Sequence, residues 1–254
     1  MDSLSLWIYL FVFLGGALSV SAAALYLTLP EAMRSKTVDY LVSLAIGILL
    51  GTSFSHLIPE ALAGDGANSQ SLMATLLFSL LLFFILEKTL IWRHYHPATG
   101  EEYKFNGKMG ASVPIILFGD SFHNFLDGVL IASAFMVDFS LGVVTGLAVV
   151  AHEIPQELGD FAILIKAGLT RRRAFLFNLF SSFVMLLGAA VALSCETVIE
   201  EYHPYLLMVT AGAFIYVAMS DLIPALDYKA DAKQLSLRIL LVAVGMIVFS
   251  IHYH

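Results

Sequence analysis

The segment GDSFHNFLDG places four polar side chains at spacings that suit one face of a helix. Asp120, His123, Asn124 and Asp127 are separated by three, four and seven residues. Residues at these separations lie on the same side of an α-helix. The spacing therefore predicts a polar stripe on a helix around residue 123.

A second segment, HEIPQELGD, repeats this concentration of histidine, carboxylate and amide. His152 and Gln156 are four residues apart, and Glu153, Glu157 and Asp160 form the adjacent stripe. Pro155 lies inside the segment, and a proline within a helix removes one backbone hydrogen bond and favours a kink. The two segments together place two histidines, several carboxylates and two amides at mid-bilayer depth.

These side chains could hold a divalent metal ion. Both segments lie in long apolar stretches, where an ionisable side chain costs about 2.5–3.5 kcal/mol. No lysine or arginine lies at the same depth, so the carboxylates need protons or a cation. Imidazole suits Zn²⁺ and Fe²⁺, and carboxylates add negative charge. The candidate metal ligands are His123, Asn124, Asp127, His152, Glu153, Gln156 and Asn178.

Other polar residues are expected to lie along the path of the ion. These residues are His56, Glu60, Asp120, Glu157 and Asp160. For the amides of the ligand set the alternative is a hydrogen bond between helices, which is common in membrane proteins.

A hydrolase is the alternative of another class. His152 and Glu153 begin like the zinc-protease motif HExxH. Gln156 stands where the second histidine is required, and Pro155 interrupts the helix that would present both ligands. A metal sensor that does not transport is a further alternative.

The composition predicts a membrane protein. Of the 254 residues, 59% are hydrophobic and 13% are charged, whereas soluble domains carry roughly 25% charge. The mean hydropathy is +0.86. The single cysteine excludes an intrachain disulfide, and the absence of a basic face argues against nucleic acid as a partner.

The elements that must position the polar residues are spanning helices of about 20 apolar residues each. We predict an all-α polytopic membrane protein with one domain over residues 1–254. Its eight transmembrane helices are expected near residues 6–29, 38–62, 71–93, 113–136, 140–166, 173–195, 204–226 and 235–252.

The positive charges predict the orientation of these helices. All 13 lysines and arginines fall in or beside the loops that follow the odd-numbered helices. Because basic loops stay in the cytoplasm, both termini are expected on the extracytoplasmic side.

An internal repeat occurs at an offset of 165 residues. The sequence SHLIP at 55–59 matches SDLIP at 220–224, and Gly47 matches Gly212. The two copies lie on helices of opposite direction, and inverted repeats are typical of transporters. The pattern predicts a 3+2+3 arrangement, in which helices 1–3 and 6–8 are the repeats.

HNFLDG and HEIPQELGD resemble the signature motifs of the ZIP (zinc/iron-regulated transporter-like) metal transporters, nearest the subfamily whose fifth helix reads HEIPHE. SHLIPEAL, FFILEK and SDLIPAL extend the resemblance over essentially the whole chain. The resemblance implies import of Zn²⁺, and often of Fe²⁺, Mn²⁺ or Cd²⁺, as transported substrate rather than cofactor. It also implies a homodimer in a lipid bilayer.

The resemblance also assigns the ligands to two neighbouring metal positions. His123, Asp127, His152 and Gln156 match one position, and Asn124, Glu153 and Asn178 match the other. Gln156 departs from the family, because relatives carry a histidine or glutamate there. The short loops and missing signal peptide favour a prokaryotic inner membrane.

Overall fold

The computed structural model describes residues 3–63, 68–95, 113–166, 168–226 and 231–250. Within these ranges all of the regular secondary structure is helical. The helices are α1 (Ser3–Phe13), η1 (Leu14–Leu18), α2 (Ser19–Tyr26), α3 (Glu31–Thr52), η2 (Ser53–Leu57), α4 (Ile58–Ala63), α5 (Ser69–Tyr95), α6 (Val113–Val137), α7 (Phe139–Lys166), α8 (Arg171–Ser194), α9 (Glu196–Tyr216), η3 (Val217–Leu222), α10 (Ile223–Ala225) and α11 (Ala232–Ser250).

Several of these helices are long and apolar enough to cross a membrane. By length and composition, five stretches of the described chain qualify: Ser3–Tyr26, Thr37–Ala63, Ser69–Leu86, Arg171–Ser194 and Glu201–Ser220. Helices α6 and α7 contain 25 and 28 residues, which corresponds to lengths of roughly 37 and 42 Å. They carry the polar segments. The prediction of a helical membrane protein is confirmed at this level.

Two helices begin well before the predicted residue. The second predicted helix (38–62) begins at Glu31, directly after the extended Pro30. The seventh (204–226) begins at Glu196 and has a kink at Tyr202, two residues before Pro204. Both extra segments carry charged residues, so neither belongs to an apolar run of the sequence. The eighth (235–252) is described only to Ser250.

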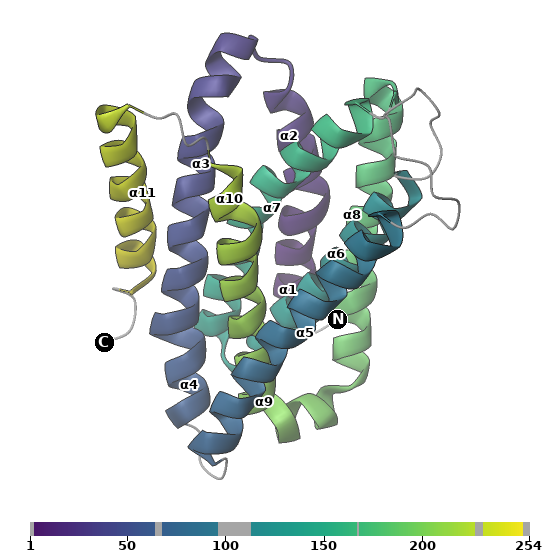
Figure 1. Cartoon of the computed structure of the whole chain (residues 1–254). Coiled ribbons are helices and arrows are strands. Elements are labelled where there is room, and N and C mark those ends of the chain that lie inside the picture. Colours follow the sequence, from purple (N-terminus) through teal and green to yellow (C-terminus); the bar gives the residue numbers. More distant parts are fainter. Residues whose placement is uncertain (1–2, 64–67, 96–112, 167, 227–230, 251–254) are drawn as a thin grey trace.

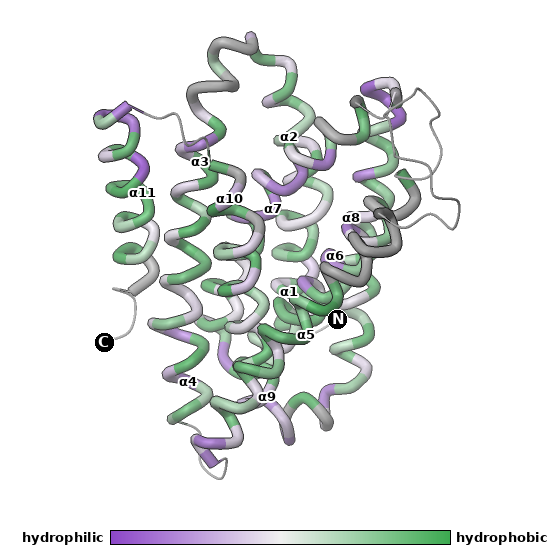
Figure 2. The backbone as a smooth tube through the Cα atoms, in the orientation of Figure 1, coloured by the Kyte–Doolittle hydropathy of each residue, from purple (hydrophilic) through white to green (hydrophobic). Residues whose placement is uncertain are grey.

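Most of the closest helix pairs join helices that are distant in sequence, and α6 also packs on the next helix, α7. Helix α3 lies beside α11, α5 beside α9, and α6 beside both α7 and α8 (Figure 1). Helices α6 and α8 approach closely at Gly128 and Gly188. A Cβ at Gly128 would overlap the backbone carbonyl of Met185, and a Cβ at Gly188 would overlap that of Phe125. Small residues permit such packing in membranes. Apolar residues extend along most of the helices (Figure 2).

The repeated sequence adopts the same local structure at both positions. Helices η2 and η3 are π-helical segments that lead directly into Ile58–Pro59 and Ile223–Pro224. The Ile58 N–H donates to the Ser53 carbonyl, and the Ile223 N–H donates to the Ala218 carbonyl. Both bonds span five residues, which is the π-helical pattern.

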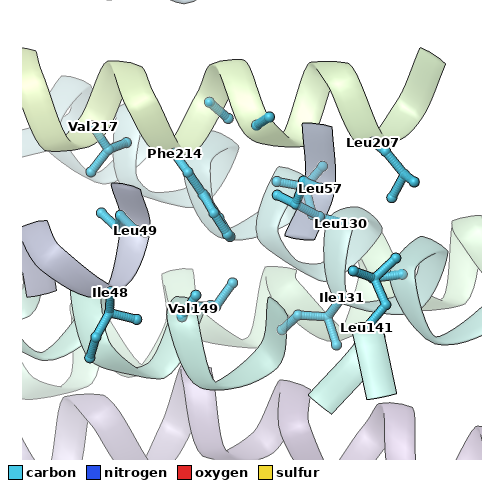
Figure 3. Packing of buried hydrophobic residues seen from close by; sticks show 14 of the residues in the cluster. Ile48, Leu49, Leu57, Leu130, Ile131, Leu141, Val149, Leu207, Phe214 and Val217 are labelled. Carbon is cyan, nitrogen blue, oxygen red and sulfur yellow. The ribbon is translucent and has the colours of Figure 1, made fainter. Parts of the chain in front are cut away.

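The hydrophobic core lies where α6 and α7 meet α3 and α9. It includes Leu49, Ile131, Leu141, Val149 and Phe214, all of which are almost completely buried (Figure 3). These residues come from four helices, so the core fixes α6 and α7 against the rest of the molecule.

Candidate metal site

Helices α6 and α7 bring four of the predicted ligands together. One nitrogen or oxygen from each of His123, Asp127, His152 and Glu153 lies within 4.8 Å of the others. His123 and Asp127 are one turn apart on α6, so both face α7. His152 and Glu153 are consecutive residues on α7, and their side chains approach α6 from adjacent positions.

The distances within this four-residue cluster are short. The Nε2 atoms of the two histidines are 3.2 Å apart, and His152 Nε2 lies 3.1 Å from Asp127 Oδ2. His123 Nε2 is 3.7 Å from Asp127 Oδ2 and 3.7 Å from Glu153 Oε1. His152 Nε2 is also 3.7 Å from Glu153 Oε1. Zinc–ligand bonds of about 2.0–2.1 Å in a tetrahedron separate the ligand atoms by about 3.3 Å. The observed spacing fits such an ion.

A backbone contact orients one of the imidazoles. His152 Nδ1 lies 3.0 Å from the carbonyl oxygen of Ala148, and only a protonated Nδ1 can donate to that oxygen. The Nε2 atom of a neutral His152 then carries a lone pair, which points toward Asp127 and His123. Metal-binding histidines commonly donate their second nitrogen in this way.

The cluster is shielded from water. The side chains of His152 and Glu153 are fully buried, Asp127 is 4% exposed and His123 is 19% exposed. Both Glu153 oxygens lack a hydrogen bond from any described residue. The Phe214 ring packs edge-on against His152, with ring centroids 5.9 Å apart. Acceptor atoms therefore converge without a basic side chain among the described ion pairs, which favours a bound cation.

Asn124 and Asp120, which lie on the same helix as His123, are hydrogen-bonded to each other. Asn124 Nδ2 donates to Asp120 Oδ1 over 2.9 Å and to the Asp120 carbonyl over 3.1 Å. Ser181 on α8 donates to the other Asp120 oxygen. Asn124 is buried, and its Oδ1 has no hydrogen-bond partner in the described chain.

The remaining predicted residues of α7 and α8 form a second polar group. Glu157 interacts electrostatically with Asp120 and Asp160 and is approached by Asn178. Glu157 and Asn178 are buried, and neither side chain has a hydrogen bond of good geometry with a described residue. Gln156 is partly exposed and approaches Asp120. Gln156 and Asn178 thus each approach an acidic side chain, Asp120 and Glu157 respectively.

The predicted entrance residues come from two other elements, η2 and α4. His56 lies in η2 and is buried, and Glu60 lies in α4 and is partly exposed. Helix η2 packs against α9.

Two contacts of buried charged residues, one beside the site and one away from it, are not evident from motif spacing. Ser181 holds Asp120, and its only signal is its position three residues after Asn178 on α8. Arg238, which the sequence places with the loop charges, is buried and pairs with Asp39 of α3.

Comparison with known proteins agrees with this architecture. The family model described as ZIP Zinc transporter matches residues 4–111 and 101–252. The chain belongs to the ZIP family. The predicted family is confirmed, and the hydrolase alternative loses its support because this is a family of transporters.

Individual ZIP relatives match parts of this chain. Zinc transporter ZIP13 of Pongo abelii is 33% identical over 221 residues, which are 82% of this chain and 64% of ZIP13. Zinc transporter ZIP4 of Rattus norvegicus is 44% identical over 119 residues, or 47% of this chain and 18% of ZIP4. Zinc transporter ZIP10 of Homo sapiens is 36% identical over 140 residues. The matched regions therefore span less than two thirds of these relatives.

Proposed function

We propose that this protein transports divalent transition-metal ions, with Zn²⁺ as the main substrate, across a membrane into the cytoplasm. The observation that carries the proposal is the convergence of His123, Asp127, His152 and Glu153, whose ligand atoms lie within 4.8 Å of one another. The relatives are named zinc transporters. Two imidazoles and two carboxylates suit Zn²⁺, and also admit Fe²⁺, Mn²⁺ and Cd²⁺.

The proposed arrangement is eight spanning helices in a 3+2+3 order. In this arrangement α6 and α7 are the central pair, and the helices before and after them are inverted repeats. The matching π-helical hydrogen bonds of η2 and η3 support this repeat. Inverted repeats that move against a central site permit alternating access.

The two ends of the α6–α7 pair differ in polarity, and this difference supports a site that opens toward the cytoplasm. Beyond the cluster, toward the α6–α7 connection, Ile131, Phe135 and Leu141 are almost completely buried. In the other direction the helices carry Asp120 and Asp160, and Gly159 is exposed. Since all the basic residues follow odd-numbered helices, this polar end faces the cytoplasm.

A path for the ion follows from this asymmetry. The ion passes His56 and Glu60 from the outside, binds the four-residue cluster, and leaves along Asp120, Glu157 and Asp160. His56 is buried, so it would become accessible only in an outward-facing state. Gln156 lies nearer the exit and would take part in release.

The test is uptake of ⁶⁵Zn²⁺ or ¹⁰⁹Cd²⁺ into proteoliposomes that contain the purified protein. Wild type is expected to accumulate the ion, and a His123→Ala/His152→Ala variant is expected to lose this uptake. His203→Ala is the matched control, because His203 lies on α9 outside the cluster. Absence of flux in wild type, or full flux in the double variant, would disprove transport through this site.

We further propose a homodimer in a prokaryotic inner membrane, with both termini extracytoplasmic. The basic odd-numbered loops support the orientation. Cysteines introduced at either terminus of the protein and labelled in intact cells test the orientation. The mass of the protein in native nanodiscs tests the dimer. Protected termini or a monomer mass would contradict them.

A further inference from the structure

The first three residues of α8 form a basic cluster on the surface of the molecule. Arg171, Arg172 and Arg173 are consecutive, and all three are exposed. Residues 161–195 contain no aspartate or glutamate that could pair with them along the chain. Within the described part of the chain, no ion pair includes any of the three guanidinium groups. The basic cluster therefore presents positive charge that no described side chain neutralises.

The basic cluster differs from the other basic residues whose side chains the structure describes. Arg238 is buried and paired with Asp39, and the exposed Lys233 of α11 lies two residues after Asp231. Three adjacent guanidinium groups offer many N–H donors, and a guanidinium binds a phosphate through two parallel hydrogen bonds. The chemistry of the basic cluster thus favours a phosphate group as its partner.

An exposed apolar stripe continues from the basic cluster along α8. Leu176 follows Arg172 by four residues and Arg173 by three, so the stripe begins on the face that carries these two arginines. The opposite face of α8 is buried and packs mainly on α6. Figure 2 shows the hydrophilic start of α8 and the mainly apolar helix that follows it. The stripe consists of Leu176, Phe177, Phe180, Phe183 and Leu187.

The stripe is about as long as one leaflet of a bilayer is deep. Leu176 and Leu187 are 11 residues apart, which corresponds to about 16 Å of helix. The hydrocarbon core of a bilayer is about 30 Å thick, so one leaflet accounts for about 15 Å. Helix α8 is long and apolar enough to cross a membrane. The basic cluster then lies at the level of the lipid headgroups, and the stripe lies beside the acyl chains.

We propose that the start of α8 binds an anionic phospholipid. The lipid phosphate binds the basic cluster, and an acyl chain lies along Phe177, Phe180 and Phe183. A zwitterionic lipid has the same phosphate, but its ammonium group is repelled by three arginines. The site therefore selects lipids with a net negative charge, such as phosphatidylglycerol. The inference concerns lipid recognition, so it does not depend on the transport activity proposed above.

The experiment is native mass spectrometry of the purified protein in detergent, titrated with phosphatidylglycerol or phosphatidylcholine. Wild type is expected to bind one phosphatidylglycerol in preference to phosphatidylcholine. Each basic residue near an anionic lipid contributes about fivefold to affinity, so Arg171→Gln/Arg172→Gln/Arg173→Gln should weaken phosphatidylglycerol binding on the order of 100-fold. Phosphatidylglycerol should also raise the unfolding temperature of wild type and not that of the triple variant. Equal unfolding temperatures without lipid show that the triple variant is folded.

Single substitutions distinguish a site from a general attraction of basic residues to anionic lipid. Arg172→Gln is expected to weaken phosphatidylglycerol binding about fivefold. Lys233→Gln is the matched control, because it removes one exposed positive charge from α11, and it should leave the binding unchanged. Phe180→Ala keeps all three arginines and should weaken the binding several-fold by removing an acyl-chain contact.

Glycerol phosphate distinguishes a lipid site from a site for a free anion. At the concentration of the lipid, it should displace no phosphatidylglycerol, because it cannot contact the stripe. The proposal is overturned if wild type binds the two lipids equally or if glycerol phosphate displaces the lipid. It is also overturned if Arg172→Gln and Lys233→Gln have the same effect, or if Phe180→Ala binds the lipid as tightly as wild type.

Discussion

The α3–α11 pair and the α6–α7 pair both bury charged side chains, but they balance that charge differently. Between α3 and α11, Asp39 accepts a hydrogen bond from Arg238 across 199 residues of sequence, and both residues are 9% exposed. Between α6 and α7, Asp127 and Glu153 face two histidines and no described lysine or arginine. The charges of Asp39 and Arg238 balance each other. The carboxylates of Asp127 and Glu153 require a proton or a metal ion to balance their charge.

The comparison separates a structural role from a binding role. The Asp39–Arg238 pair joins two helices whose backbones also approach closely, since a Cβ at Gly47 would overlap the Val242 carbonyl. Its charges therefore contribute to holding α3 and α11 together. The carboxylates of Asp127 and Glu153 add little to the unliganded fold, because no described lysine or arginine pairs with them. Mutations in the two regions should consequently affect different properties.

The largest expected effect is on stability, from removing one partner of the closed pair. Arg238→Met leaves the Asp39 carboxylate buried and unpaired, which should lower the free energy of unfolding by about 3–5 kcal/mol. Denaturant or thermal unfolding in detergent measures this loss. Zinc affinity should be unchanged in the fraction that stays folded.

Asp39→Leu/Arg238→Met is the matched control for this variant. It removes both charges, so most of the lost stability should return. If the single and double variants unfold alike, the ion pair has no special role. A fall in zinc affinity in either variant would show that the two regions are not separate.

The next effect is on zinc binding, from removing a charge in the unbalanced cluster. A four-ligand zinc site binds with roughly 10–16 kcal/mol, or about 3 kcal/mol per ligand. Asp127→Asn should therefore weaken zinc binding on the order of 100-fold. The metal-free protein should keep its stability or gain some, because an uncompensated buried charge has been removed. Calorimetry with a competing chelator and unfolding without metal measure the two quantities.

Asp138→Asn is a control for this second variant, since Asp138 lies between α6 and α7 and accepts a hydrogen bond from the Leu141 N–H. It should leave zinc affinity unchanged. If Asp127→Asn destabilises the metal-free protein as strongly as Arg238→Met does, the contrast between the two regions is wrong.

The same contrast explains what the sequence could predict. Asp127 follows His123 by four residues, so helical periodicity alone indicates that both face one side of α6. The absence of a lysine or arginine at the same depth predicted that the carboxylates of these segments need a proton or a cation. The Asp39–Arg238 contact depends on how distant helices pack, and spacing along the chain carries no signal for it. The contact of Ser181 with Asp120 has the same origin.

Spacing alone does not say which of the predicted amide ligands share an ion with the four-residue cluster. Asn124 has the expected helical position, but its amide is bonded to Asp120. Asn178 approaches Glu157. Which polar residues share one ion depends on the relative depth of three helices, and a shift of one turn is enough to divide them into two groups.

The smallest expected effect concerns Gln156, which lies at the border of those two groups. Gln156→His adds an imidazole one turn beyond His152, on the side where the ion would leave. An additional ligand that reaches the ion should tighten zinc binding by about tenfold, or roughly 1.4 kcal/mol. Because release then becomes slower, the maximal rate of ⁶⁵Zn²⁺ uptake should fall while the half-saturating concentration also falls.

Gln156→Leu, which has no ligand atom, should leave the affinity within a few fold of wild type. Unchanged affinity in Gln156→His would mean that residue 156 faces only the acidic group around Asp120, and that the four-residue cluster binds its ion without it.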